Sequence, residues 1–196
     1  MARRMGVFGG AFDPPHVAHG ALARAAVDQL ALDELRILPT GQAWHKSRPL
    51  TAPEHRLAMT RLAFAEVPHA VVDDRELRRS GPTYTVDTLR ELQAEQPGAE
   101  LFLLMGEDQA GALTGWHDWE AVVALAVICV ATRTAAPGEA RPALPPQART
   151  RAIVMPPMAA SATGIRSLVR SGAPIADLVA PPVARYIAHH HLYRPA

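Results

Sequence analysis

Two glycines and two histidines near the start of the chain have the residue types and spacing best suited to chemistry. Gly9 and Gly10 follow a short apolar run, and His16 and His19 stand three residues apart where an alanine-rich helical pattern begins. Glycines let the backbone approach a bulky ligand because no Cβ intervenes. A helix start presents unpaired N–H groups and the positive end of the helix dipole, and residues three apart share one helix face. Together these features predict a site for a polyphosphate.

A second segment of this kind, Ser-Ala-Thr-Gly-Ile-Arg, lies near the C-terminal end at Ser161–Arg166. Ser161 or Thr163 can cap a helix, and their hydroxyls and the free N–H groups can also donate to phosphate oxygens. Arg166 adds a permanently charged planar fork that suits the same anion. A capped helix with a solvated arginine is the plain structural alternative. The presence of the first segment favours phosphate binding.

Strand and helix patterns alternate along the whole chain, which predicts an α/β fold with a Rossmann-like parallel sheet and helices on both of its faces. The predicted strands are Arg4–Phe8, Leu35–Leu38, Ala70–Asp73, Leu101–Met105, Ala126–Ala131 and Ala152–Met155. The predicted helices are Val17–Leu30, one capped by a Thr51/Glu54 capping box, Thr83–Gln93, one opened by Gly115–Trp119, Ile165–Arg170 and one initiated by Pro181. Gly10 and Gly106 both follow strands, so we expect both at the carboxyl-end rim, where ligands of such sheets bind.

Length and composition exclude several classes of protein. The 196 residues favour one domain, 1–196, in which the proline- and alanine-rich stretch 134–150 is expected to be a mobile surface loop. A net charge of +1 offers no basic footprint for nucleic acid. The longest apolar run, Ala121–Ala131, is far shorter than the ~20 residues of a membrane span, and no signal peptide is recognised. The single cysteine, Cys129, lies in an apolar run, which predicts a reduced core thiol and a cytoplasmic protein.

Two polar clusters are expected to be ordinary surface. His189–His191 are consecutive, so their side chains point in different directions on a helix, and their spacing does not match a zinc site. The charged run Arg75–Arg79 is predicted to be a solvated edge.

The first segment resembles, nearly residue for residue, the Gly-Gly-x-Phe-Asp-Pro-x-His-x-x-His signature of the nucleotidyltransferase superfamily. Ser161–Arg166 resembles a second element of that superfamily, whose members join a nucleoside triphosphate to an acceptor and release pyrophosphate. Two positions depart from the usual pattern, because Ala18 replaces a glycine and Ala160 an isoleucine.

Three further segments are similar to the bacterial nicotinate-nucleotide adenylyltransferase family. They are Ala43–Lys46, Arg75–Leu89, and Leu104–Asp108 followed by Trp116. The resemblance covers nearly the whole chain except residues 134–150. It implies transfer of the adenylyl group of ATP to nicotinate mononucleotide, which gives nicotinate adenine dinucleotide and pyrophosphate.

The resemblance also implies which residues form the site. The implied catalytic residues are His16, His19 and Arg166. The implied ATP-binding residues are Gly9, Gly10, Phe12, His16, His19, Gly106, Asp108, Ser161, Thr163 and Arg166. The implied mononucleotide-binding residues are Asp13, His45, Lys46, Tyr84, Thr85 and Trp116.

Several of these residue types suit nicotinate mononucleotide. Trp116 can stack on a cationic pyridine ring, and a helix start at Tyr84-Thr85 would prefer an anionic carboxylate over a neutral amide. Asp108 can accept hydrogen bonds from ribose hydroxyls. The plain alternatives are a core role for Trp116, a helix-dipole role for Asp108 and an ordinary surface position for Lys46.

The expected partners are the small molecules ATP and nicotinate mononucleotide, and a homo-oligomer stays open. Mg²⁺ is expected to accompany ATP, held mostly by phosphate oxygens and water, so no dedicated protein metal site is predicted. Two alternatives remain. One is a related transferase that uses nicotinamide mononucleotide, pantetheine phosphate or a cytidylyl donor. The other is a non-catalytic nucleotide-binding protein, which would bind ATP without releasing pyrophosphate.

Overall fold

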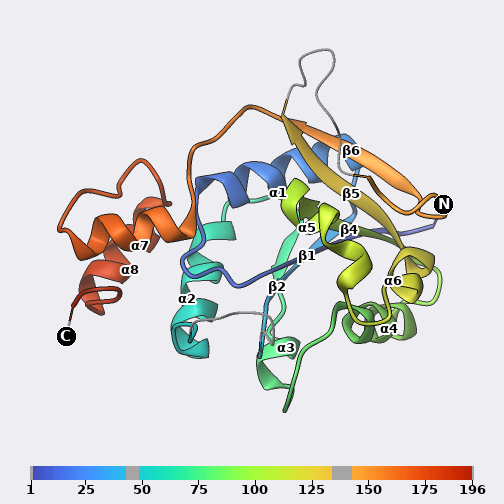
Figure 1. The fold of residues 1–196 in the computed structure, drawn as a ribbon, viewed down its shortest axis with the longest axis horizontal. Coiled ribbons are helices and arrows are strands. Elements are labelled where there is room, and N and C mark those ends of the chain that lie inside the picture. The colour runs from blue at the N-terminus through green and yellow to red at the C-terminus, as the bar shows by residue number, and fades with distance from the viewer. Residues whose placement is uncertain (1, 43–48, 134–142, 196) are drawn as a thin grey trace.

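Six parallel strands form one sheet in the order β3-β2-β1-β4-β5-β6 (Figure 1). The structure, a computed structural model, describes residues 2–42, 49–133 and 143–195. The strands are β1 Arg4–Gly10, β2 Glu34–Pro39, β3 Ala70–Val72, β4 Glu100–Gly106, β5 Ala126–Arg133 and β6 Thr150–Met155. The helices are α1 Val17–Leu30, α2 Pro53–Phe64, α3 Arg75–Arg78, α4 Thr85–Glu95, α5 Glu107–Gly111, α6 Trp119–Leu125, α7 Ala162–Arg170 and α8 Pro181–His189, with a 3-10 turn, η1, at Leu113–Gly115.

This architecture confirms the predicted Rossmann-like parallel sheet. The strand order places β1 and β4 side by side at the centre, where the direction of strand addition reverses. Ligands of open α/β sheets bind outside the carboxyl ends of the strands at this switch point. Gly10 ends β1 and Gly106 ends β4, so both glycines lie on that rim as predicted.

Helices cover both faces of the sheet (Figure 1). Side chains alternate between the faces along a strand, and in β4 Phe102 and Leu104 pack with α1 and α2, whereas Leu101 and Leu103 pack with α4 and α6. Cys129 is buried on the α1 face, as predicted, and burial raises the pKa of its thiol to about 12. The sheet is therefore a rigid platform with an apolar layer on either side.

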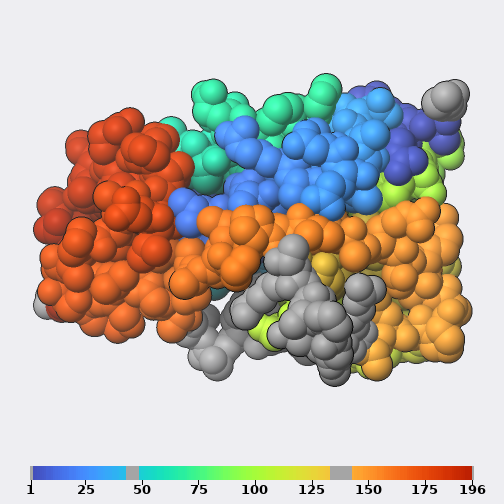
Figure 2. Space-filling model, turned by 90° about the horizontal axis from the view of Figure 1, so that it is seen from above, coloured from blue at the N-terminus to red at the C-terminus, as the bar shows by residue number. Residues whose placement is uncertain are grey.

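A lobe formed by α7, α8 and the residues up to 195 lies at one end of the molecule beside α2 (Figure 1). The segment after β6 crosses alongside α1 to reach it (Figure 2). The C-terminal lobe has its own small core, in which Met59 of α2 packs with Ile165, Val183 and Ile187. The second phosphate segment is thereby carried to the same side of the molecule as the first.

Several local predictions were wrong. The predicted capping box does not form, because Ala52 is the residue before α2 and the Thr51 N–H donates instead to the Asp13 carboxylate (3.2 Å). The helix predicted from Thr83 begins at Thr85, and Thr83 is buried. The residues around Gly115 form η1, and α6 begins only at Trp119. At Thr51 a contact with a distant segment overrides the local signal.

The stretch 134–150 is described only in part, since 134–142 lie outside the described residues. Leu144 and Ala148 pack against the core on the α4 side of the sheet, and Thr150 already belongs to β6. Among the described residues, every helix is too short or too polar to cross a membrane.

Candidate active site

Two adjoining cavities open at the carboxyl ends of the central strands. The larger has a volume of about 850 Å³ and the smaller of about 520 Å³. Both are lined by Gly9, Gly10 and Ala11 on one side and by Asp108 and Gln109 on the other. The glycine turn is thus a shared wall, and a molecule in one cavity can meet a molecule in the other across it.

His16 and His19 form a stacked pair in the wall of the larger cavity, with ring centroids 3.7 Å apart. The His16 backbone N–H donates to His19 Nδ1 (3.1 Å), which closes the first turn of α1. An accepting Nδ1 places the proton of neutral His19 on Nε2. The His19 ring also packs edge-on against Phe12, with centroids 5.1 Å apart. Its orientation is therefore fixed before any ligand binds.

Burial keeps both imidazoles neutral near pH 7. It lowers the pKa of His16 to about 4. The pKa of His19 also lies well below its usual value, first through burial and then through repulsion from His16. An anion placed in the cavity favours the protonated form of a neighbouring imidazole. The pair can therefore adjust its charge to a bound polyphosphate.

The second phosphate segment faces the histidines across the larger cavity. Thr163 and Arg166 belong to its wall, and Arg166 donates to the Asp13 carbonyl (2.8 Å) and to Thr163 Oγ1 (3.0 Å). Ser161 caps α7 by accepting from the Gly164 N–H (3.1 Å) and is not in the described wall. The fold thus brings together two segments that are about 150 residues apart.

Other residues predicted for ATP also line the larger cavity. Phe12 is buried and packs edge-on against Phe8 and Phe64, so it supports the glycine turn. Gly106 lines the larger cavity only, whereas Asp108 lines both. Ala18, which departs from the usual glycine, contributes to the wall without interrupting α1.

The residues predicted for the mononucleotide are divided. Tyr84, Thr85 and Trp116 line the smaller cavity, and α4 begins at Thr85, so its first N–H groups lie at this cavity. Asp13 instead lies in the wall of the larger cavity, where its buried carboxylate is used in protein hydrogen bonds. His45 and Lys46 lie outside the described residues.

Sequence reasoning missed several residues of the smaller cavity, among them His117 and Thr83. His117 lies against the Tyr84 ring, with centroids 4.1 Å apart and planes inclined by 30°. Thr83 has a buried hydroxyl without a partner among the described residues. Both stand next to predicted residues, so their position in the sequence was the available signal.

Comparison with known proteins identifies the family. Residues 7–168 match the family model described as cytidylyltransferase-like. A curated relative from Albidiferax ferrireducens, named "Probable nicotinate-nucleotide adenylyltransferase", is 58% identical over 99% of this chain and 100% of its own length. A relative of the same name from Methylibium petroleiphilum is 42% identical over 98% of this chain and 93% of its own. The chain belongs to the nicotinate-nucleotide adenylyltransferase family.

Solved structures support the fold of this adenylyltransferase family member. The nicotinic acid mononucleotide adenylyltransferase of Plasmodium falciparum, complexed with NaAD, matches with a TM-score of 0.82 over 97% of both chains, at 18% identity. The structure of a "Putative Nicotinate-nucleotide Adenylyltransferase" from Vibrio parahaemolyticus matches with a TM-score of 0.72 over 99% of this chain and 97% of its own, at 16% identity. At this identity the likeness establishes the common fold.

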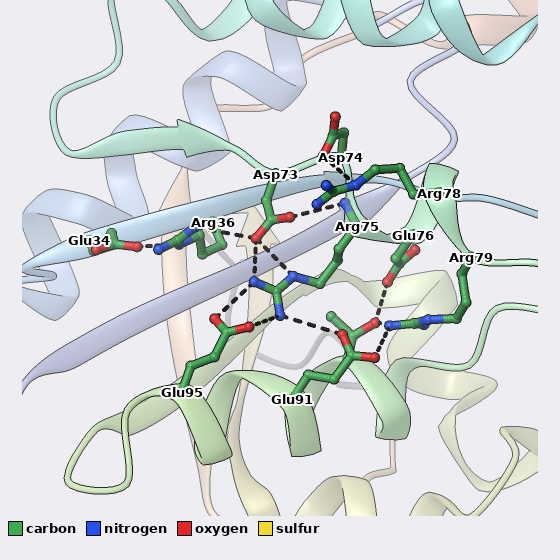
Figure 3. Close-up of polar contacts among 11 residues, drawn as sticks. Glu34, Arg36, Asp73, Asp74, Arg75, Glu76, Arg78, Arg79, Glu91 and Glu95 are labelled. Carbon is green, nitrogen blue, oxygen red and sulfur yellow. Dashed lines mark hydrogen bonds and ion pairs between the residues drawn. The ribbon is translucent and has the colours of Figure 1, made fainter.

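The prediction that Arg75–Arg79 is a solvated edge was wrong for most of these residues (Figure 3). Helix α3 packs its charges against α4. Arg75 bridges Asp73 of the preceding turn and Glu95 of α4, at 2.8 and 2.9 Å, and its side chain is only 13% exposed. Glu76 is 6% exposed and accepts from the Thr88 hydroxyl (2.7 Å). Most of the run is therefore an interface with α4. Arg78 is the exception, because its side chain is 72% exposed and pairs with Asp74, as expected of a solvated edge.

Glu76 is also a residue of the smaller cavity that the sequence did not reveal. Burial raises the pKa of this carboxyl to about 7, although the Thr88 hydrogen bond and the Arg79 charge act in the opposite direction. The Glu76 carboxyl therefore titrates in the physiological range. Buried titratable groups in a cleft are candidates for a functional role.

Glu76→Gln is expected to change how stability depends on pH. Between pH 4.5 and about 7 the folded protein holds the Glu76 proton more tightly than the unfolded chain, so this group lowers stability as pH rises. We expect the variant to gain on the order of 3 kcal/mol relative to the wild type between pH 4.5 and 8. Urea unfolding of both proteins at several pH values measures this difference. A constant difference across the range would contradict the raised pKa.

His190, one of the three consecutive histidines near the C-terminal end, packs in an aromatic cluster with His55 and Tyr186. His55 Nδ1 lies 2.9 Å from the Tyr186 hydroxyl, and the His190 ring packs against both rings. Within the described part of the chain, no three His, Cys, Asp or Glu side chains are grouped to hold a metal ion. His189–His191 are all exposed, which confirms the predicted surface position, and His190 packs locally beside α8 and α2.

Proposed function

We propose that this chain transfers the adenylyl group of ATP to nicotinate mononucleotide, with release of pyrophosphate. The arrangement that carries the proposal is the pair of cavities that share the glycine turn. The larger has histidines and an arginine for a triphosphate, and the smaller has an aromatic ring and a helix start for an acidic pyridine. The P. falciparum enzyme of similar fold, solved in complex with NaAD, supports the same chemistry.

In this proposal the triphosphate of ATP occupies the larger cavity. His19 Nε2 donates to the oxygens around the bond between the α- and β-phosphates, and His16 supports it from the stacked position. Arg166 and Thr163, on the opposite wall, hold the β- and γ-phosphates as pyrophosphate leaves. The negative charge that develops on the leaving group is thus met from two sides.

The mononucleotide occupies the smaller cavity. Its carboxylate accepts hydrogen bonds from the first N–H groups of α4, which begins at Thr85, and its ring stacks on Trp116. Asp108, which lines both cavities, accepts hydrogen bonds from the ribose hydroxyls. Its phosphate attacks the α-phosphorus in line with the departing pyrophosphate. This phosphate is already an anion near neutral pH, so the protein contributes position and charge rather than a strong base. His45 and Lys46 are assigned to the same substrate from the sequence alone.

Mg²⁺ is proposed to enter with ATP. It would be held mostly by phosphate oxygens and water, and the Glu107 carboxylate in the wall of the larger cavity would add an oxygen ligand that suits this ion. When bound, the ion neutralises phosphate charge. We place the reaction in the cytoplasm, which the single free and buried Cys129 supports.

The test compares two acceptors that differ only in the pyridine substituent. Pyrophosphate release from ATP is measured with nicotinate mononucleotide and with nicotinamide mononucleotide. We expect kcat/KM to be about 10-fold or more higher with the acid, because a hydrogen bond to a charged group contributes about 1.5–3 kcal/mol. Thr85→Val removes the hydroxyl but keeps the N–H, so the preference should persist in this variant.

Three outcomes contradict parts of the proposal. Equal efficiency with both acceptors contradicts the acid preference. Loss of the preference in Thr85→Val assigns it to the hydroxyl rather than to the helix start. ATP binding without pyrophosphate release with either acceptor supports the non-catalytic alternative.

A further inference from the structure

The turn that carries the phosphate motif is held by side chains from far along the chain. The Ala11 carbonyl accepts from Arg56 (3.0 Å), and the Asp13 carbonyl accepts from Arg166 (2.8 Å). Between them Phe12 adopts a left-handed conformation with φ of 45°. A residue with a Cβ is unfavourable in this conformation and persists there only when its surroundings hold it. The geometry of the motif therefore depends on contacts outside it.

The Asp13 side chain is the deepest of these contacts, with 1% exposure. Its Oδ1 accepts from the Tyr193 hydroxyl (2.7 Å), and its Oδ2 accepts from the Thr51 N–H (3.2 Å). Burial, followed by the neighbouring carboxylate, raises the pKa of Tyr193, so its hydroxyl stays protonated and donates. A buried carboxylate is costly unless such donors reach it. Tyr193, three residues before the end of the chain, supplies one of them.

The C-terminal lobe brings Tyr193 to this position. Leu192 and Tyr193 pack on its core, and the Tyr193 hydroxyl lies 3.9 Å from Met59 Sδ of α2. The lobe also contacts the motif a second time, because the Leu178 carbonyl accepts from the Val17 N–H (3.0 Å) at the start of α1. Figure 1 shows α7 and α8 beside α2 and the start of α1. The lobe therefore makes hydrogen bonds to the motif on both sides of His16, at Asp13 and at Val17.

We propose that Tyr193 is a positioning residue for ATP, which acts through Asp13 to hold the phosphate-binding turn in place. The proposal rests on the proposed function, since it concerns the same site. Tyr193 is not in the described wall of either cavity, so it does not touch the substrate itself. Phe12, Asp13 and His16 line the larger cavity and are absent from the described wall of the smaller one, so the contact with Tyr193 acts mainly on the ATP side of the site.

The test compares two tyrosines of the same lobe. Tyr193→Phe removes only the hydroxyl that reaches Asp13. Tyr186→Phe is the matched control, because Tyr186 is also half-buried on the lobe core and its hydroxyl pairs with His55 (2.9 Å) instead. For each variant we measure kcat, the KM for ATP, the KM for nicotinate mononucleotide and the melting temperature.

We expect Tyr193→Phe to raise the KM for ATP about tenfold, the size expected if most of the lost hydrogen bond to the Asp13 carboxylate is coupled to ATP binding. The KM for the mononucleotide should stay within about twofold, as should all constants of Tyr186→Phe. A lower melting temperature with an unchanged KM for ATP would show a merely structural role and overturn the proposal. Equal rises in both KM values would do the same.

A double-mutant cycle with Asp13→Asn tests the route of the effect. If Tyr193 acts through Asp13, the double variant should weaken binding of a methylene-bridged, uncleavable ATP analogue no more than Asp13→Asn alone. Additive losses would contradict this. Because analogue binding requires no turnover, this measurement separates the positioning role from the proposed reaction. A wild type that binds the analogue but releases no pyrophosphate would contradict the proposed function alone.

Discussion

His19→Ala is expected to lower kcat by about 10²-fold or more, the usual cost of removing one donor to a developing negative charge. The His19 ring is fixed by the His16 N–H on Nδ1 and by the edge of Phe12, which leaves Nε2 as its donor to a ligand. Initial rates of pyrophosphate release at saturating ATP and mononucleotide measure the effect. Circular dichroism and the melting temperature check that the fold persists.

Alanine removes two functions of His19 at once, and two further variants separate them. His19→Asn can keep an acceptor near the position of Nδ1 for the His16 N–H, but it lacks a donor at the position of Nε2. His19→Gln can reach toward that position but loses the ring. If His19 acts on the phosphates, Asn should be nearly as inactive as alanine, and Gln should recover part of the rate. Full activity in His19→Asn would reduce His19 to a helix cap.

The local structure of the first phosphate segment could be predicted from the sequence because its information is local. The glycines, the histidines and the start of α1 lie within one short segment, and α1 spans Val17–Leu30 as predicted. Alternating strand and helix patterns then give the parallel sheet, and the switch-point rule places Gly10 and Gly106 on one rim. Each of these steps depends on neighbours in the chain or on a general rule of topology.

The remaining features depend on contacts between distant segments. A charged run such as Arg75–Arg79 looks solvated until α3 is packed against α4, and only then does Glu76 become a buried group beside a cavity. Thr51 stands where the sequence predicts a helix cap, but its backbone N–H donates a hydrogen bond to the Asp13 carboxylate. The contact of Asp13 with Tyr193 joins residues 180 positions apart. No periodicity or propensity records such pairs.

Arg166→Ala is expected to lower kcat/KM for ATP by about 10²–10³-fold, since Arg166 is the cation that the second segment contributes to the triphosphate. The reverse reaction gives the more specific measurement. If Arg166 holds pyrophosphate, the variant should show a strongly raised KM for pyrophosphate when ATP is formed from nicotinate adenine dinucleotide. The KM for the mononucleotide in the forward direction should change little.

Arg166 also donates to the Asp13 carbonyl and to Thr163 Oγ1, so its loss could act through the turn instead of the phosphates. Thr163→Val removes one of these protein contacts and keeps the guanidinium. Arg166→Lys keeps the charge but loses the planar fork. A phosphate role predicts that Lys recovers part of the affinity for pyrophosphate. If Lys behaves as alanine does while Tyr193→Phe shows the same pattern of constants, the arginine serves mainly to hold the turn.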